Sequence, residues 1–147
     1  MPLSEMVDKK LISCTPEDSV KSAAELMKVH DVGAILVIDS GGSPVGIITD
    51  RDIVIRCVCG THADCSDLMV RNIMTRSPKT VRDSDGLLDV IRAMKSEGVR
   101  RIPIVNREGR AVALVSFSDV LELLATEVAA LAATAASADK KLVNQVA

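Results

Sequence analysis

Two short stretches of the sequence pair a hydroxyl side chain with a carboxylate at the same spacing. Thr49 and Asp52 lie in GIITDRDI, and Ser116 and Asp119 lie in ALVSFSDV. At the start of a helix, a hydroxyl can accept a backbone N–H, and an acid three residues later suits the positive end of the helix dipole. The same free N–H groups can bind phosphate, and a carboxylate beside them can bind ribose hydroxyls. The residue types therefore allow helix capping or nucleotide binding.

The recurrence of this pattern reflects an internal duplication. Residues 27–53 align without gaps on residues 94–120, so each residue corresponds to the one 67 positions later. Upstream, TPEDS (15–19) is matched with TVRDS (80–84), which requires two additional residues in the second copy. Both hydroxyl–acid pairs end an apolar run at the same place in their copy. The duplication therefore favours the binding interpretation over capping alone.

Each copy is expected to contain a helix, a strand, a turn, a strand and a further helix. The periodicity and turn residues predict these in the first copy at 19–30, 34–39, 40–44, 45–49 and from 50, and in the second at 86–97, 101–105, 106–109, 111–116 and from about 118. One such unit is too small to bury its own sheet. The predicted fold is therefore α/β (α+β), with two small mixed sheets packed face to face, helices outside and a pseudo-twofold axis.

The ordered motifs resemble a tandem pair of CBS domains, the module named for cystathionine β-synthase. The resemblance rests on the two hydroxyl–acid motifs, on VRRIPIV (99–105) and on VRNIMT (70–75), and it covers about residues 3–125. It divides the chain as a first repeat at 3–59, a linker at 60–69, a second repeat at 70–125, and a C-terminal helical extension and polar tail at 126–147.

The resemblance implies a regulatory module that binds an adenosine-containing ligand in the clefts between the repeats. The ligands of such modules are AMP, ADP, ATP, NAD or S-adenosylmethionine, and AMP or ATP is expected here. The implied roles are ribose binding by Asp52 and Asp119; phosphate or ribose contacts by Thr49 and Ser116; backbone contacts to the base by Val32, Gly33 and Ala34; phosphate contacts by Arg100 and Arg101; and a polar position opening each copy at Thr15 and Thr80. Arg51 is either a further ligand contact or a solvated residue.

The two clefts are not expected to be equivalent. The second copy has Arg100 and Arg101 where the first has Gly33 and Ala34, so the clefts differ in charge. It also has Ala113 in place of the glycine usual in the family motif, and the added methyl group is expected to crowd the second cleft. At least one competent site is therefore expected.

Composition excludes several other classes of function. Aromatic residues make up 1% of the chain and the net charge is −2, which argues against a nucleic-acid binder. No apolar run approaches about 18 residues, so no membrane span is expected, and the start lacks a secretory h-region, so a cytoplasmic location is expected. There is no nucleophile elbow, P-loop or HExxH motif. A binding module without a catalytic cofactor is expected, not an enzyme.

The segment CVCGTHADC places four potential soft ligands between the copies: Cys57, Cys59, His62 and Cys65. A metal or redox sensor is the alternative function that this cluster suggests. However, the C-x-C spacing suits a single tetrahedral site poorly. The favoured interpretation is a helix end whose cysteines are free thiols, as in other cytoplasmic proteins, with one or both packed in the core. A redox role through a disulfide of Cys57 or Cys59 with Cys65 is a further alternative.

The final predicted helix continues beyond what the repeat needs. Apolar residues recur from Val120 to Leu131, followed by an alanine-rich stretch to Ala138. Such a stripe suits the same helix of a second chain, or it folds back on its own module. Because CBS pairs dimerise, the resemblance implies a homodimer that signals to an effector protein the sequence does not name.

Overall fold

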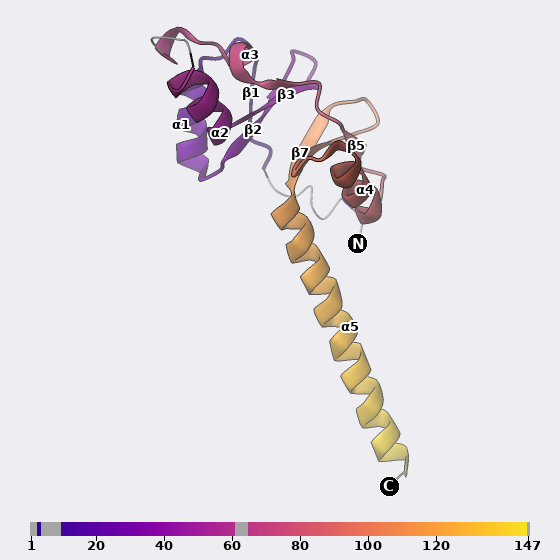
Figure 1. Ribbon diagram of the computed structural model, residues 1–147. Helices are drawn as coiled ribbons and strands as arrows, with labels where there is room; N and C mark the ends of the chain where they lie inside the picture. The colour runs from indigo at the N-terminus through magenta and orange to yellow at the C-terminus, as the bar shows by residue number, and fades with distance from the viewer. Residues whose placement is uncertain (1–2, 4–9, 61–64, 147) are drawn as a thin grey trace. The chain divides into compact units, whose positions relative to one another are not determined.

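The computed structural model describes residue 3, residues 10–60 and residues 65–146. The chain divides into two compact units, Met1–Val115 and Ser116–Ala147, and each is described by itself. The first unit contains two small sheets with helices, and the second is dominated by one long helix (Figure 1). The predicted α/β class with two mixed sheets is confirmed.

The first sheet has the strand order β1-β2-β3-β4. These strands are β1 (Ser13–Cys14), β2 (Ala34–Ile38), β3 (Pro44–Thr49) and β4 (Thr75–Arg76). β1 is parallel to β2, and the pairs β2–β3 and β3–β4 are antiparallel. The buried runs of β2 and β3 are rich in Ile and Val, which pack well on a pleated surface.

Helix α1 (Val20–His30) contacts β2 through one apolar face. The Ser19 side chain caps its first turn by accepting the Ser22 N–H, and Asp31 ends it in the left-handed conformation at φ 52°. After β3 the chain forms the short helix α2 (Asp50–Asp52), which continues as the π-helical segment η2 (Ile53–Val58). The 3₁₀ turn η3 (Cys65–Asp67) and α3 (Val70–Ile73) then lead to β4.

The second sheet has the order β5-β6-β7 and belongs to the second repeat. Its strands are β5 (Val81–Arg82), β6 (Arg101–Val105) and β7 (Ala111–Ser116), and α4 (Leu87–Glu97) packs on β5 and β6. The Ala111 N–H donates a hydrogen bond to the Gly42 carbonyl at 2.9 Å. The turn between β2 and β3 of the first repeat therefore contacts the start of β7 of the second repeat within the first unit.

The offset of 67 residues holds through the opening strand of each repeat. Cys14 pairs with Val37 in the first sheet, and Val81 pairs with Ile104 in the second. The turns that follow agree, because the Thr15 N–H donates to Asp18 Oδ2 at 2.7 Å and the equivalent Arg82 N–H donates to Asp85 Oδ2 at 2.8 Å. The proposed match of TPEDS with TVRDS, with its two additional residues, is therefore wrong.

Thr15 and Thr80 are consequently not equivalent positions. The structural counterpart of Thr15 is Arg82, and the counterpart of Thr80 is Ser13. The segments 15–19 and 80–84 resemble each other in sequence because each contains a threonine followed three residues later by an Asp–Ser pair. The hydrogen-bond register of the strands, which the letters do not show, sets the true correspondence.

Residues 68–76 pack on the first repeat although the sequence motif VRNIMT opens the second. The Val20 N–H donates to the Leu68 carbonyl at 2.9 Å, and the Val70 N–H donates to the Asp18 carbonyl at 2.8 Å. Leu68, Val70, Ile73 and Met74 are buried in the core cluster of the first repeat. Burying a side chain of this size stabilises the fold by about 1.5–3 kcal/mol. The segment is therefore an integral part of the first repeat.

Gly46 is required by this packing. A Cβ atom at Gly46 would lie 2.6 Å from Met74 Sδ and 3.0 Å from the Thr75 carbonyl oxygen. The glycine thus allows β4 to approach β3. From the sequence, the methyl group of Ala113, the counterpart of Gly46, is expected to crowd a ligand cleft. In the first repeat, however, Gly46 faces β4 and its preceding residue Met74.

Helix α5 (Phe117–Val146) is 30 residues long, and nearly all its side chains after Val120 are exposed. Its mean hydropathy reaches 1.5 over an 18-residue window. By length and composition it is the one helix in the described part of the chain that could cross a membrane. The expectation that no segment would qualify counted only uninterrupted apolar residues, and this helix meets the criterion despite containing Glu122 and Glu127.

Candidate functional site

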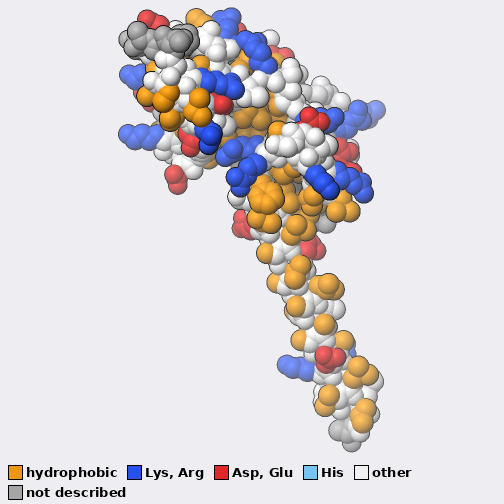
Figure 2. All heavy atoms as spheres, in the orientation of Figure 1, with side chains coloured by type: hydrophobic (Ala, Val, Ile, Leu, Met, Phe, Trp, Pro, Cys, Tyr) orange, Lys and Arg blue, Asp and Glu red, His pale blue; other side chains and the backbone are white. Residues whose placement is uncertain are grey.

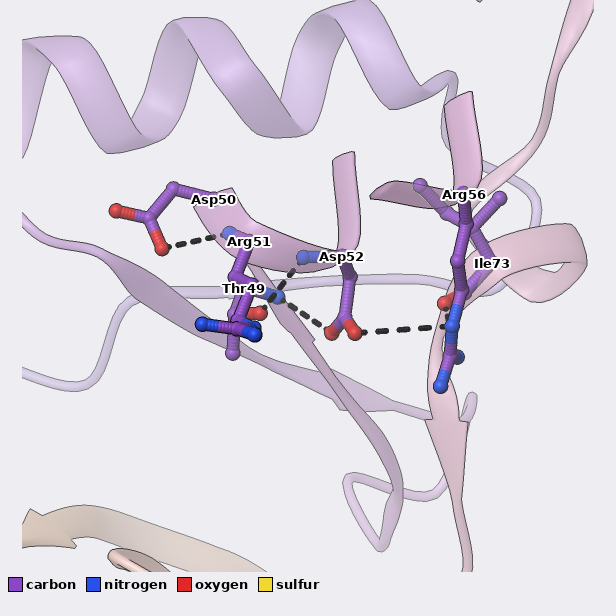
Figure 3. A network of polar contacts seen from close by, with 6 residues as sticks. All are labelled: Thr49, Asp50, Arg51, Asp52, Arg56 and Ile73. Atoms are coloured by element: carbon purple, nitrogen blue, oxygen red, sulfur yellow. Dashed lines mark hydrogen bonds and ion pairs between the residues drawn. The ribbon is translucent and has the colours of Figure 1, made fainter. Parts of the chain in front are cut away.

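The first hydroxyl–acid motif forms a reciprocal capping box at the start of α2 (Figure 3). The Asp52 N–H donates to Thr49 Oγ1 at 3.0 Å, and the Thr49 N–H donates to Asp52 Oδ2 at 3.0 Å. Both side chains are half-buried. Capping, the simpler of the two interpretations, is therefore realised in the structure. It also fixes the Asp52 carboxylate in one orientation, which a binding group needs.

The second oxygen of Asp52 faces an arginine. Asp52 Oδ1 lies 3.8 Å from Arg56 Nε, one helical turn away. Arg56 in turn donates from Nη1 to the Ile73 carbonyl at 2.8 Å (Figure 3). The Arg56 side chain is 48% exposed, so this ion pair adds well under 1 kcal/mol of stability. Its main consequence is geometric, because it connects Asp52 to the segment that leads into the second repeat.

The backbone of residues 32–34 lies beside this motif. Ala34 is directly opposite Thr49 in the antiparallel pair β2–β3, and the Asp50 N–H donates to the Gly33 carbonyl at 3.0 Å. A Cβ atom at Gly33 would lie 3.0 Å from Asp50 Oδ2, so glycine keeps this approach open. Val32, Gly33 and Ala34 are half-buried. The structure thus brings six of the predicted site residues together at one end of the first sheet: Val32, Gly33, Ala34, Thr49, Arg51 and Asp52.

Thr15 does not belong to this group. It follows Cys14, which pairs with Val37 near the far end of β2, whereas Thr49 pairs with Ala34 at its beginning. Ala34 and Val37 are three positions apart along β2, a distance of about 10 Å. Thr15 is exposed, and its N–H is held by Asp18.

The second motif repeats the capping box at the start of α5. The Ser116 N–H donates to Asp119 Oδ2 at 2.8 Å, and the Asp119 N–H donates to Ser116 Oγ at 3.2 Å. Here the Ser116 hydroxyl also donates to Asp119 Oδ2 at 2.7 Å. Both motifs therefore present an anchored half-buried carboxylate, and the hydroxyl proton of the second is used inside the motif.

The predicted basic residues of the second repeat lie at the entrance of β6. Arg101 begins the strand and is half-buried, and Arg100 precedes it and is exposed. They occupy the positions that Gly33 and Ala34 hold in the first repeat. Thr80 is half-buried and precedes β5, the parallel neighbour of β6.

Thr80 also borders an open hollow of about 480 Å³ at the other end of these strands. Its lining includes Arg82, Asp85, Asn106 and Arg107. Asn106 Oδ1 accepts the N–H groups of Glu108 and Arg110, which fixes the turn after β6. Sequence reasoning missed these residues. The uniform offset of 67 would have identified Arg82 and Asp85 as the counterparts of Thr15 and Asp18.

Two of the four cysteines form a disulfide, contrary to the prediction of free thiols. Cys57 is bonded to Cys65, and their Cα atoms are 5.6 Å apart, within the usual range. Cys57 lies near the end of η2 in the core of the first repeat, and Cys65 begins η3 and packs against the same core. This shared packing brings the two thiols together, which their spacing in the sequence does not reveal.

The other two cysteines are free thiols, as predicted. Cys59 is exposed and Cys14 is buried. Burial, with a smaller contribution from the charge of Asp18, raises the pKa of Cys14 to about 12. His62 lies outside the described residues, and within those residues no group of three or more potential metal ligands is found.

Comparison with known proteins identifies the repeats. The pattern of the family described as "CBS domain" matches residues 3–58 and 70–126. A protein from Methanopyrus kandleri is 29% identical over 122 residues, and the chain spans 61% of that relative's length. A conserved protein from Pyrococcus horikoshii has a crystal structure that is 34% identical, with a TM-score of 0.69 and coverage of 83% of this chain and 90% of that one.

A further crystal structure is that of CBSX2 in complex with AMP. It is 26% identical, with a TM-score of 0.70, and covers 80% of this chain and 90% of that one. Two matched segments, each containing one hydroxyl–acid motif, thus account for most of the sequence. The chain belongs to the CBS domain family and carries two tandem CBS repeats.

Proposed function

We propose that the chain is a regulatory CBS-pair module that binds an adenosine-containing ligand, with AMP or ATP as the first candidates, at the Thr49–Asp52 motif. One observation carries the proposal: the Asp52 carboxylate is fixed by the Thr49 N–H, and Thr49 lies opposite Ala34. The proposal is supported by the neighbourhood of this carboxylate, because a potential acceptor for ribose hydroxyls lies beside the half-buried residues 32–34, whose backbone is proposed to contact the base. The AMP complex of CBSX2, a similar structure, supports this ligand class.

The phosphate groups of the ligand require positive charge. We assign this role to Arg51 near the first motif and to Arg100 and Arg101 in the second repeat. A guanidinium fork can bind two phosphate oxygens at once, which an ammonium group cannot. Ser116 and Asp119 are proposed as the corresponding hydroxyl and ribose acceptor of a second site.

The response to ligand is proposed to pass through Arg56. This side chain contacts both Asp52 and the Ile73 carbonyl. A ribose that hydrogen-bonds Asp52 competes with Arg56 for the carboxylate and so changes the restraint on residues 68–76. Ligand binding then favours one arrangement of this segment over another, which is the requirement for a regulatory effect. We propose that the module acts as a cytoplasmic homodimer on a separate effector protein and without turnover of its ligand.

Calorimetric titration of the full chain with AMP, ADP, ATP, NAD and S-adenosylmethionine tests the proposal. At least one ligand is expected to bind, and Asp52→Asn should weaken it by roughly tenfold or more, since a hydrogen bond to a charged group is lost. Asp119→Asn should weaken only binding at the proposed second site, so loss of the same binding event in both variants would contradict the assignment of two sites. Absence of binding by all five ligands at millimolar concentration would refute the proposal, and appearance of hydrolysis products would refute the absence of turnover.

The disulfide supports a redox sensor as a second candidate. Cys57 and Cys65 are bonded to each other and are not thiolates, the form that binds metals, so the structure favours the redox version of this alternative. A dithiol reductant would convert the bond to two thiols and itself become a disulfide. Mass spectrometry of alkylated protein should then show two additional modified cysteines after reduction. An unchanged count would eliminate this candidate.

A further inference from the structure

Apolar side chains recur along α5 with the spacing of a coiled coil. They alternate at intervals of three and four residues, which is the a and d pattern of a heptad repeat. The positions are Leu121, Leu124, Val128, Leu131, Ala135 and Ala138, and Leu142 continues the series. More than three heptads follow this register, a length that indicates a coiled coil and not an ordinary surface helix.

This seam is exposed in the chain. Leu121 is 50% exposed, Val128 65% and Leu131 71%. Figure 2 shows hydrophobic side chains along the length of α5. A helix of 30 residues spans about 45 Å. Isolated helices are marginally stable in water, and helices in proteins gain most of their stability from packing of an apolar face, so this seam requires a partner surface.

The charges on α5 argue against a membrane as that partner. Glu122 and Glu127 lie in its first half, and Asp139, Lys140 and Lys141 follow the alanine-rich stretch. The uncharged run between them, residues 128–138, is about 16 Å long at the helical rise. This is about half of the roughly 30 Å hydrocarbon core of a bilayer.

We propose that α5 forms an antiparallel two-stranded coiled coil with α5 of a second copy of this chain. Antiparallel packing sets a positions against d positions. In the register that sets Leu124 against Leu142 of the second copy, Leu131 faces Ala135 and Val128 faces Ala138. Large side chains thus meet small ones in the middle of the seam, which allows close approach of the two helices.

The flanking charges select this register. Glu127 and Lys141 both occupy g positions and lie two heptads apart. In the antiparallel register each Glu127 faces Lys141 of the second copy, and the two-fold axis produces this ion pair twice. In a parallel pair Glu127 faces Ala132 instead, and Lys141 faces Val146. Charge complementarity therefore favours the antiparallel arrangement of two copies.

Cysteine cross-linking in the full chain tests the arrangement. The background is Cys59→Ser, which removes the exposed native thiol. Leu124→Cys and Leu142→Cys variants, differently tagged and co-expressed, should form a mixed disulfide dimer on mild oxidation, and neither variant should cross-link to itself. Self-linked Leu124→Cys would show a parallel pair and overturn the proposal. Absence of an interchain product from the co-expressed pair would also overturn it.

Charge reversal provides an independent test of the register. Glu127→Lys should lower the yield of the mixed cross-link by roughly threefold or more, and the double variant Glu127→Lys with Lys141→Glu should restore it. Glu122→Lys, which lies off the seam, is the matched control. The proposal fails if Glu122→Lys and Glu127→Lys act alike. It also fails if the chain floats with phosphatidylcholine–phosphatidylglycerol vesicles and loses the cross-link there.

Discussion

Thr49 and Asp52 hold each other through two hydrogen bonds of 3.0 Å that run in opposite directions between backbone and side chain. The two hydrogen bonds that cap the start of α2 therefore also fix the carboxylate proposed to bind ribose. Capping and binding are therefore not competing explanations for this motif. The cap supplies the rigidity, and the remaining acceptor positions of the carboxylate supply the interaction.

Substitutions at Asp52 should separate these two contributions. Asp52→Ala removes the half of the capping box in which the carboxylate accepts the Thr49 N–H, and it is expected to lower the free energy of unfolding by about 1 kcal/mol. Asp52→Asn keeps an oxygen that accepts the Thr49 N–H, so it should cost less stability while still weakening the ligand. Urea unfolding and calorimetry measure the two effects. Equal loss of stability in both variants would contradict the separation.

Gly46→Ala should destabilise the first repeat by about 1–3 kcal/mol because the new methyl group collides with Met74 and the Thr75 carbonyl. Gly86→Ala is the matched control, since a Cβ atom there would lie 3.6 Å from its nearest neighbour, Asp89 Oδ2. Thermal unfolding of both variants provides the comparison. A neutral Gly46→Ala would show that β4 does not approach β3 as described.

Reduction of the Cys57–Cys65 disulfide should lower the free energy of unfolding. Loop-closure entropy for a separation of 8 residues predicts a loss of about 2–3 kcal/mol. Urea unfolding with and without dithiothreitol measures it, and Cys65→Ser should unfold identically in both conditions. Cys59→Ser should behave like the unmodified protein, and a wild-type chain insensitive to the reductant would contradict the bond.

Cys14 should be inert in the folded protein. Burial raises its pKa from 9.0 to about 12, so the thiol remains protonated where an exposed thiol ionises. Iodoacetamide at pH 9 is expected to modify Cys59 rapidly and Cys14 only after denaturation. The unfolded state ionises above about pH 9 and the folded state only near pH 12. The contribution of the Cys14 thiol to the free energy of unfolding is therefore complete below pH 9 and declines between pH 9 and pH 12. Unfolding curves of the unmodified protein across this range, with Cys14→Ala as the control, measure the decline.

Local features of this fold could be predicted from the sequence, and long-range ones could not. Helix α4 and the hairpin strands appear nearly where periodicity and turn residues place them. The offset that equates Asp52 with Asp119 also identified both capping boxes. These features depend on neighbouring residues, whose effects are visible in the letters.

The errors concern contacts between distant segments. The register of β1 on β2 decides that Thr15 corresponds to Arg82, and no local pattern records it. Met74 explains Gly46 only once β4 joins β3. The Cys57–Cys65 bond depends on two segments packing on one core. Each of these features follows from tertiary packing, which local patterns in a single sequence do not predict.

The packing of residues 68–76 on the core and sheet of the first repeat means that the unit of duplication differs from the unit of folding. A fragment that ends at residue 60 contains the whole first sequence copy, yet it lacks Leu68, Val70, Ile73 and Met74 from its core. Engineered exchange of a single repeat must therefore cut the chain after residue 76. Any change that displaces residues 68–76 therefore alters both the core of the first repeat and the connection to the second repeat.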